Sequence, residues 1–209
     1  MVKVEQLMDI NGNMLKSDIE ISKNPIAALD EVGRGCLAGP VVTAAVILPK
    51  DFESPIVKDS KKLSEKKRKE AFELIKEKAI KWTVTFTSPQ EVDDLNILQA
   101  TMKGMHECLS NLDGEFNHIL VDGNYFLPYK DIKHDCVIKG DNTYYSIAAA
   151  SIVAKVMRDD FMKELHLTYP DYKWDGNKGY GSAEHIEKIK EIGTTKWHRK
   201  SFLKNILQS

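Results

Sequence analysis

Cysteine is scarce in this chain, and long apolar runs are missing altogether. The three cysteines, Cys36, Cys108 and Cys136, show neither a paired metal-ligand spacing nor a Cys-x-x-Cys redox pattern, so we expect reduced, mostly buried thiols. Charged residues interrupt the first 21 positions, and no apolar run approaches the roughly 18 residues of a membrane span. We therefore expect neither a secretory signal nor a membrane role, and a cytoplasmic location.

An excess of charge of one sign is absent too. The 30 basic and 31 acidic residues give a formal net charge of −1, which excludes a protein that holds nucleic acid by bulk positive charge. Any nucleic-acid site must then be a local basic patch. A length of 209 residues fits one main domain with at most a small appendage.

The apolar pattern alternates between short β-rich runs and longer helical ones, as in α/β domains. A capping box at Ser88, with Pro89 and Glu91, begins a predicted helix in which apolar residues recur at three- and four-residue steps from Leu95 to Leu109. The composition of the basic C-terminal tail favours a solvated surface helix. Strands are predicted over 26–29, 41–48, 83–87, 118–121 and 136–138, and further helices over 144–165 and 182–192.

Four acidic residues stand where predicted strands end. Asp30 and Glu31 follow the first strand directly, Asp122 follows the fourth, and Asp141 comes just after the fifth. Taken singly, they have ordinary explanations: a solvated strand end for the pair, an Asp-Gly turn for Asp122 and a helix cap for Asp141. In a parallel or mixed sheet, however, all four would meet at one edge.

Clustered carboxylates repel one another and raise one another's pKa unless a cation lies between them. Magnesium and manganese bind several oxygen ligands, whereas the scattered histidines have no spacing typical of a zinc enzyme. Two such ions about 3.5–4 Å apart could activate water and stabilise an in-line displacement at phosphorus. The acids thus predict metal-dependent phosphodiester hydrolysis.

A glycine-rich stretch at 33–40 lies between the first two predicted strands. It is a near miss to the dinucleotide-binding fingerprint, but it leads to a strand and lacks the helix N-terminus that binds pyrophosphate. Its backbone groups could instead hydrogen-bond a ribose 2′-hydroxyl, the group that separates RNA from DNA, while Arg34 supplies charge for a phosphate.

With these motifs in place, the sequence resembles the ribonuclease HII family, the prokaryotic type 2 ribonucleases H, over most of its length. The related ribonuclease HIII branch lacks the arginine found at Arg34 and carries an extra N-terminal domain for which residues 1–24 are too few, so the HII branch is favoured. The matching segments are DEVGRG at 30–35, LAGPVV at 37–42, DSKKL at 59–63, NILQA at 96–100, VDGN at 121–124, KGD at 139–141, AAASIVAKV at 148–156 with RD at 158–159, GYG at 179–181 before His185, and HR at 198–199 before SF at 201–202.

The resemblance implies an α/β fold with a ribonuclease H-like mixed β-sheet flanked by helices. It implies a catalytic domain over 1–168 and a small helical, substrate-binding segment over 169–209 packed on it. The implied activity is endonucleolytic cleavage of the RNA strand of RNA–DNA hybrids and of ribonucleotides embedded in duplex DNA, giving 5′-phosphate and 3′-hydroxyl ends. The implied catalytic and metal-binding set, holding two Mn²⁺ or Mg²⁺ ions when substrate is bound, is Asp30, Glu31, Asp122 and Asp141.

Substrate contacts follow from the same resemblance. Gly33, Arg34 and Gly35 would read the 2′-hydroxyl at an RNA-to-DNA junction, and Tyr180 would stack on the sugar of the next deoxynucleotide. On its own Tyr180 looks like a loop tyrosine half-buried for packing. Backbone phosphates would meet Lys61, Lys62 and Arg199.

The expected partners are RNA–DNA hybrids and DNA duplexes containing ribonucleotides, and the expected state is a monomer. Residues 202–207 are either a docking peptide for a sliding clamp or an ordinary terminal helix. Two alternatives stay open: a catalytically silent hybrid-binding module, which the intact acid set disfavours, and a recombinase or DNA-specific nuclease with a similar sheet, which the glycine-arginine loop and Tyr180 disfavour.

Overall fold

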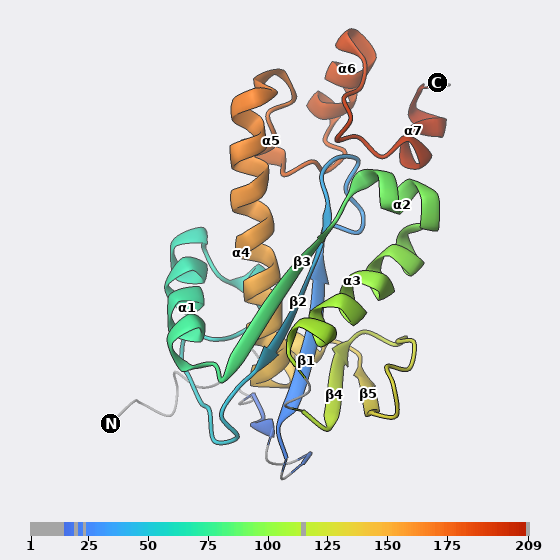
Figure 1. Cartoon of the computed structure of the whole chain (residues 1–209). Coiled ribbons are helices and arrows are strands. Elements are labelled where there is room, and N and C mark those ends of the chain that lie inside the picture. The colour runs from blue at the N-terminus through green and yellow to red at the C-terminus, as the bar shows by residue number, and fades with distance from the viewer. Residues whose placement is uncertain (1–14, 19–20, 23, 114–115, 208–209) are drawn as a thin grey trace.

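The computed structural model describes residues 15–207 except 19, 20, 23, 114 and 115, and a five-stranded sheet forms its centre (Figure 1). The strand order is β3-β2-β1-β4-β5; β2 pairs antiparallel with β1 and β3, whereas β4 pairs parallel with β1 and β5, so the expected mixed sheet is confirmed. The strands are β1 (Ile26–Val32), β2 (Val41–Ile47), β3 (Lys81–Thr87), β4 (His118–Asp122) and β5 (Lys133–Val137). The helices are α1 (Glu65–Lys78), α2 (Pro89–Leu95), α3 (Ile97–Asn111), α4 (Tyr145–Thr168), α5 (Trp174–Asn177), α6 (Ala183–Ile192) and α7 (Lys200–Leu207), with short 3-10 turns η3 (Ser60–Lys62), η4 (Gly140–Asn142) and η5 (Pro170–Tyr172).

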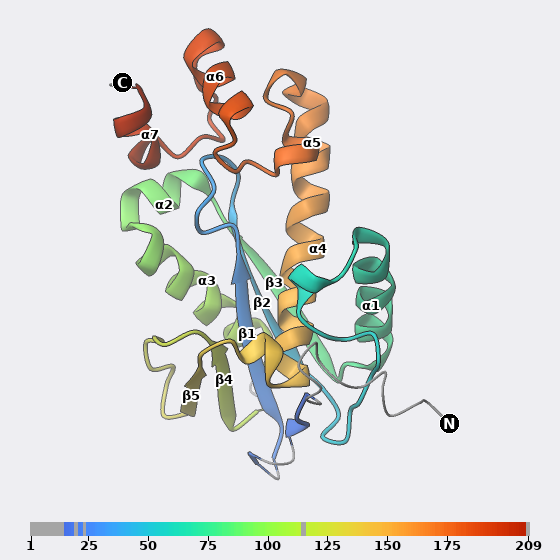
Figure 2. The same cartoon turned by 180° about the vertical axis from the view of Figure 1, so that it is seen from behind.

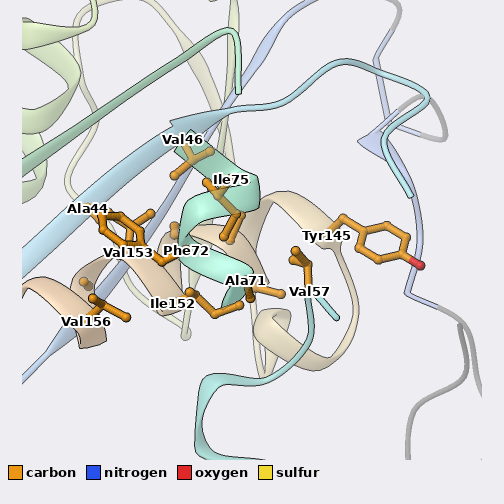
Figure 3. Packing of buried hydrophobic residues seen from close by; sticks show 14 of the residues in the cluster. Ala44, Val46, Val57, Ala71, Phe72, Ile75, Tyr145, Ile152, Val153 and Val156 are labelled. Atoms are coloured by element: carbon orange, nitrogen blue, oxygen red, sulfur yellow. The ribbon is translucent and has the colours of Figure 1, made fainter. Parts of the chain in front are cut away.

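The central strands β1 and β2 are apolar almost throughout because helices cover both faces of the sheet. Val42, Ala44 and Val46 face the layer completed by α1 and α4, whereas Ala45 and Ile47 face the layer completed by α3. Figure 3 shows side chains of β2, α1 and α4 meeting in the first layer. The sheet therefore separates two apolar clusters of the core.

Helix α4 is the central packing helix that its alanines predict. Ala148, Ala149, Ala150 and Ala154 are fully buried, and their small side chains let the helix lie close to β1 and β2. This close approach brings polar residues of α4 to the sheet edge where the acids lie.

The helix predicted from Ser88 onward is broken in two, which corrects the expectation of one continuous helix. The capping box of Ser88 and Glu91 is present at the start of α2, but Asn96 adopts φ 68° and ψ 163° and ends it. The Asn96 side chain then accepts hydrogen bonds from the backbone N–H groups of Leu98 and Gln99 and caps α3. The apolar periodicity runs through the break and conceals it.

The C-terminal elements pack on the end of α4 and on the 33–40 loop, and both views show α5, α6 and α7 at one end of the molecule (Figures 1 and 2). Trp174 is fully buried between Met162 of α4 and the surrounding elements. The tail is not simply a solvated helix, because His198 and Arg199 are 2% and 0% exposed.

Within the part of the chain that the structure describes, no helix is long and apolar enough to cross a membrane. The three cysteines are free, as expected; Cys36 and Cys108 are buried, and Cys136 is half-buried.

Replacing Asn96 by alanine tests the break between α2 and α3. Asn96→Ala should lower the free energy of unfolding by about 1–2 kcal/mol, because it removes a helix cap and keeps a β-carbon at a backbone conformation that favours glycine. Asn96→Gly loses the same side-chain cap but relieves the backbone strain, so it should cost clearly less. Urea unfolding of the three proteins measures this, and equal stability of Asn96→Ala and wild type would contradict it.

Candidate active site

Strand register brings the acids together at one edge of the sheet. Asp30 lies near the end of β1, and Asp122 is the last residue of the neighbouring parallel strand β4. Because Leu29 pairs with Val121, the next residues on the two strands are these two aspartates. Asp141 follows β5, which is parallel to β4, and lies in η4. The strand ends therefore bring Asp30, Glu31 and Asp122 to one edge, with Asp141 next to Asp122.

Each carboxylate is held by hydrogen bonds from the surrounding chain. Asp30 accepts from the backbone N–H of Glu31 at 2.7 Å and from the hydroxyl of Ser151 on α4. Asp122 accepts from the backbone N–H of Gly140 at 2.7 Å, which ties η4 to β4. The side-chain amide of Asn142 donates to Asp141.

The electrostatics of this edge favour the uptake of a cation. Burial raises the pKa of Asp30 well above its ordinary value, and the neighbouring charges of Glu31 and Asp122 raise it further. Burial likewise raises the pKa of Glu31, while the guanidinium of Arg34, 3.2 Å away, opposes the shift. Burial and the charges of Asp59 and Asp122 raise the pKa of Asp141.

An oxygen-only donor set of this kind fits magnesium or manganese. In the described ranges, no three His, Cys, Asp or Glu side chains are gathered closely enough to enclose a single ion. The fit to a metal thus rests on the donor chemistry and on the mutual repulsion of the carboxylates.

A cavity of about 310 Å³ opens at this edge. Asp30, Glu31 and Asp122 line it on one side, and Lys61 and Tyr180 also border it. Asp141 does not line it and lies beside the lysine. Acidic, basic and aromatic groups therefore face the same space.

The 33–40 loop leaves β1 directly beside the acids. Gly33 has φ +90°, and a β-carbon there would lie 2.2 Å from Nε of Arg158, so the position accepts only glycine without rearrangement. Nothing lies within 4 Å of the corresponding position at Gly35, which is open on that side. Arg34 is 46% exposed and pairs with Glu31.

Two buried arginines hold this loop in place. Arg158 of α4 donates to the backbone carbonyls of Pro40, Ala38 and Lys178 at 2.8–3.0 Å. Arg199 donates twice to the carbonyl of Gly39 and once to that of Arg34, at 2.8–3.1 Å. Both side chains are 0% exposed, so they act from beneath the loop.

Tyr180 follows a second glycine that touches the loop. The carbonyl of Gly179 accepts from the backbone N–H groups of Leu37 and Ala38. Tyr180 is 43% exposed, lines the cavity and contacts the buried thiol of Cys36. The resemblance placed this tyrosine at the site, and the structure brings it to the acids across about 150 residues of sequence.

Comparison with known proteins places these features in a family. The family model described as Ribonuclease HII matches residues 27–205. The chain belongs to the ribonuclease HII family.

Curated relatives support this membership. The ribonuclease HII of Christiangramia forsetii is 51% identical over 87% of this chain and 91% of the relative, and that of Parabacteroides distasonis is 53% identical over 84% and 88%. A solved complex of PCNA with ribonuclease HII from Archaeoglobus fulgidus matches with a TM-score of 0.69 and 28% identity, over 84% of this chain and 94% of that one. The ribonuclease H2 of Pyrococcus horikoshii matches in fold, with a TM-score of 0.71 and 23% identity over 88% and 97%.

Membership makes the chain a type 2 ribonuclease H, a divalent-metal-dependent hydrolase that cuts RNA–DNA hybrids endonucleolytically.

Of the residues that the family resemblance marks as phosphate contacts, Lys61 is open to solvent, with its ammonium 3.9 Å from Asp141. Lys62 hydrogen-bonds Asn142 and is 3.8 Å from Asp59.

Arg199 requires a correction. The resemblance predicts that it meets a phosphate, but its guanidinium is fully buried and bonded to loop carbonyls, so it positions the ribonuclease HII glycine loop from below. Sequence reasoning also gave no role to Arg158 or Ser151. The sequence pattern that could have identified them is a polar residue on an otherwise apolar helix face. Both are spaced from Ala154 at helical steps.

Exchanging Arg199 for lysine tests its role beneath the loop. Arg199→Lys keeps the charge, but one ammonium cannot reproduce the fork of hydrogen bonds to Gly39 and Arg34, so the free energy of unfolding should fall by about 2–4 kcal/mol. Lys61→Ala, at an exposed side chain, should change it by less than about 0.5 kcal/mol. Chemical denaturation distinguishes the two variants. Unchanged stability of Arg199→Lys would contradict the role of the guanidinium beneath the loop.

Neutralising Asp30 tests the strain of the acidic edge. Because the pKa of Asp30 is raised in the folded chain, the ionised carboxylate opposes folding, and this penalty grows as pH rises from the ordinary value of 3.8 through the folded pKa. Asp30→Asn should therefore make the metal-free protein more stable at neutral pH by about 1 kcal/mol or more, roughly 2–4 °C in Tm. The difference should shrink towards acidic pH. Thermal unfolding in a chelator measures this, and a less stable variant at neutral pH would contradict the electrostatic account.

Proposed function

We propose that this ribonuclease H cuts at single ribonucleotides embedded in duplex DNA as well as in longer hybrids. The observation that carries the proposal is the meeting of three elements at one cavity: the carboxylates of Asp30, Glu31 and Asp122, the glycine-arginine loop beside them, and the half-exposed ring of Tyr180. The first element suits phosphodiester hydrolysis, and the other two suit recognition of a sugar.

Asp30, Glu31, Asp122 and Asp141 are the proposed ligands of two Mg²⁺ or Mn²⁺ ions when substrate is bound, and such ions would activate the attacking water and stabilise charge on both sides of the phosphorus. The products would carry a 5′-phosphate and a 3′-hydroxyl. Acidic residues that repel one another in the free chain would then find their counter-charge in the complex.

The loop and Tyr180 supply the proposed choice of substrate. Backbone groups of Gly33 and Gly35 would hydrogen-bond the 2′-hydroxyl, and Arg34, exposed and next to Glu31, would meet a phosphate. The ring of Tyr180 would lie on the sugar of the deoxynucleotide that follows. Lys61 and Lys62, from η3 beside Asp141, would contact the backbone further along.

Docking to a sliding clamp is a second proposal, favoured by the Archaeoglobus fulgidus ribonuclease HII solved with PCNA. In this chain α7 packs Leu203 and part of Phe202 against its own body, so a clamp would have to use its exposed end at Leu207 or release the helix. The monomeric state, the cytoplasmic location and the division at 168/169 stay predictions.

The deciding experiment is cleavage of a DNA duplex carrying one embedded ribonucleotide, with an all-DNA duplex as control, in Mg²⁺, in Mn²⁺ and in chelator. We expect a metal-dependent cut on the 5′ side of the ribonucleotide and none in the control. Asp122→Asn, which removes one charge with little change of shape, should reduce the rate by a factor of about 10² or more while circular dichroism and Tm stay close to wild type.

Four outcomes would each change the proposal. Cutting of long hybrids alone would remove junction reading and keep the nuclease, and binding without any cutting would favour the silent binding module. Cutting of the all-DNA control would favour a DNA nuclease with this sheet. Near wild-type activity of Asp122→Asn would remove that residue from the catalytic set.

A further inference from the structure

Two buried histidines lie next to Tyr180, and the proposed chemistry makes no use of them. His185 and His198 are 1% and 2% exposed, and their Nε2 atoms are 3.3 Å apart. The indole Nε1 of Trp174 lies 3.1 Å from Nε2 of His185. Each neutral imidazole has one donor and one acceptor nitrogen, so the contact between two buried rings depends on which nitrogen of each carries the proton.

The surrounding hydrogen bonds favour one arrangement of those protons. Nδ1 of His185 lies 2.8 Å from the carbonyl oxygen of Tyr180, which can only accept, so His185 carries its proton on Nδ1. Its Nε2 is then an acceptor, which matches the indole N–H of Trp174 pointing at it. Nδ1 of His198 accepts from the backbone N–H of Thr195 at 2.9 Å, so His198 carries its proton on Nε2. The N–H groups of His198 and Trp174 then share the single lone pair of Nε2 of His185.

The result is a one-way chain of donors: Thr195 to His198, His198 to His185, and His185 to the carbonyl of Tyr180. A further proton on either ring would set two N–H groups against each other or against a backbone donor. Burial lowers the pKa of His185, and burial together with His185 lowers the pKa of His198 to about 4, so both rings are neutral at neutral pH.

The chain connects the two parts of the site that read the substrate. At one end the Tyr180 carbonyl accepts from His185 and from the backbone N–H of Ser182, at 2.8 and 2.9 Å, which fixes the backbone that carries the ring. At the other end His198 forms an antiparallel bridge with Ala38 of the 33–40 loop. A shift in either histidine therefore moves Tyr180 relative to that loop.

We propose that His185, kept in the Nδ1–H form by His198 and Trp174, is a positioning residue that sets Tyr180 against the glycine loop and so determines how strongly the enzyme prefers an RNA-to-DNA junction. This inference rests on the proposed function, because it assigns His185 to the junction-reading part of that site. His185 is 1% exposed and does not line the cavity. Its effect passes through the Tyr180 backbone.

The tautomers can be measured without any activity assay. Two-bond ¹H–¹⁵N correlation spectra of the whole chain at neutral pH should show His185 in the Nδ1–H form and His198 in the Nε2–H form, both neutral. The opposite tautomer at His185, or a charged ring at either position, would overturn the inference even if every cleavage assay agreed with it.

A pair of amide substitutions separates positioning from mere packing. The amide nitrogen of asparagine falls near the place of Nδ1, whereas that of glutamine falls near the place of Nε2. His185→Asn should keep the donor to Tyr180, and His185→Gln should lose it. We expect His185→Gln to lower the ratio of junction cleavage to long-hybrid cleavage about tenfold, as for a lost buried hydrogen bond, and His185→Asn to stay within about twofold of wild type.

Controls make the comparison decisive. Tyr180→Ala gives the ratio expected when the ring is absent, and His118→Asn with His118→Gln repeats the exchange at a buried histidine that starts β4, at the end of the strand opposite Asp122. The His118 pair should leave the ratio unchanged.

Equal ratios for the two His185 variants, or equal loss on both substrates in proportion to a lower Tm, would overturn the inference. Failure of the wild type to cut at the junction would instead contradict the proposed function, and the spectra would still judge the tautomers.

Discussion

The shape of the active site depends on two positive charges buried beneath its glycine loop. Arg158 and Arg199 are fully inside the protein, and each gives three hydrogen bonds to backbone carbonyls of the loop and its neighbour Lys178. A buried guanidinium costs several kcal/mol unless its donors are satisfied, so these carbonyls have to stay where they are. One arginine comes from α4, and the other directly precedes α7. The loop can therefore take its shape only when the central helix and the C-terminal elements are both folded on the sheet.

The acidic edge, unlike the hydrogen-bonded arginines, destabilises the fold. Asp30 stands in β1 between two other strands, next to apolar partners, where carboxylates are avoided. Apolar burial on both faces of the sheet has to offset the repulsion among the acids. Such a conflict between local preference and overall fold is expected at a functional site and is rare elsewhere in a stable protein.

The sequence predicts the parts of this structure that are governed by local pattern. Four of the five strands, α4 and the convergence of Asp30, Glu31, Asp122 and Asp141 follow from short apolar runs ending in acids. The predicted strand at 136–138 begins later than β5, because β5 is half-exposed and has no apolar run. The apolar steps continue across the break at Asn96, so periodicity alone does not reveal it. The burial of Arg199 could not be predicted, since its acceptors lie about 160 residues away in the sequence.

Different residues hold the two parts of the site. Register between β1 and β4 and contacts from α4 hold the carboxylates, whereas buried arginines and neutral histidines hold the loop and Tyr180. The two sets meet mainly where Arg34 pairs with Glu31, 3.2 Å apart. Helix α4 contributes to both sets, through Ser151 to Asp30 and through Arg158 to the loop, whereas Arg199 and the histidines act on the loop and Tyr180 alone. If the proposed function holds, preference for a junction over a long hybrid would depend on packing at residues away from the acids, and hydrolysis would depend on the sheet edge.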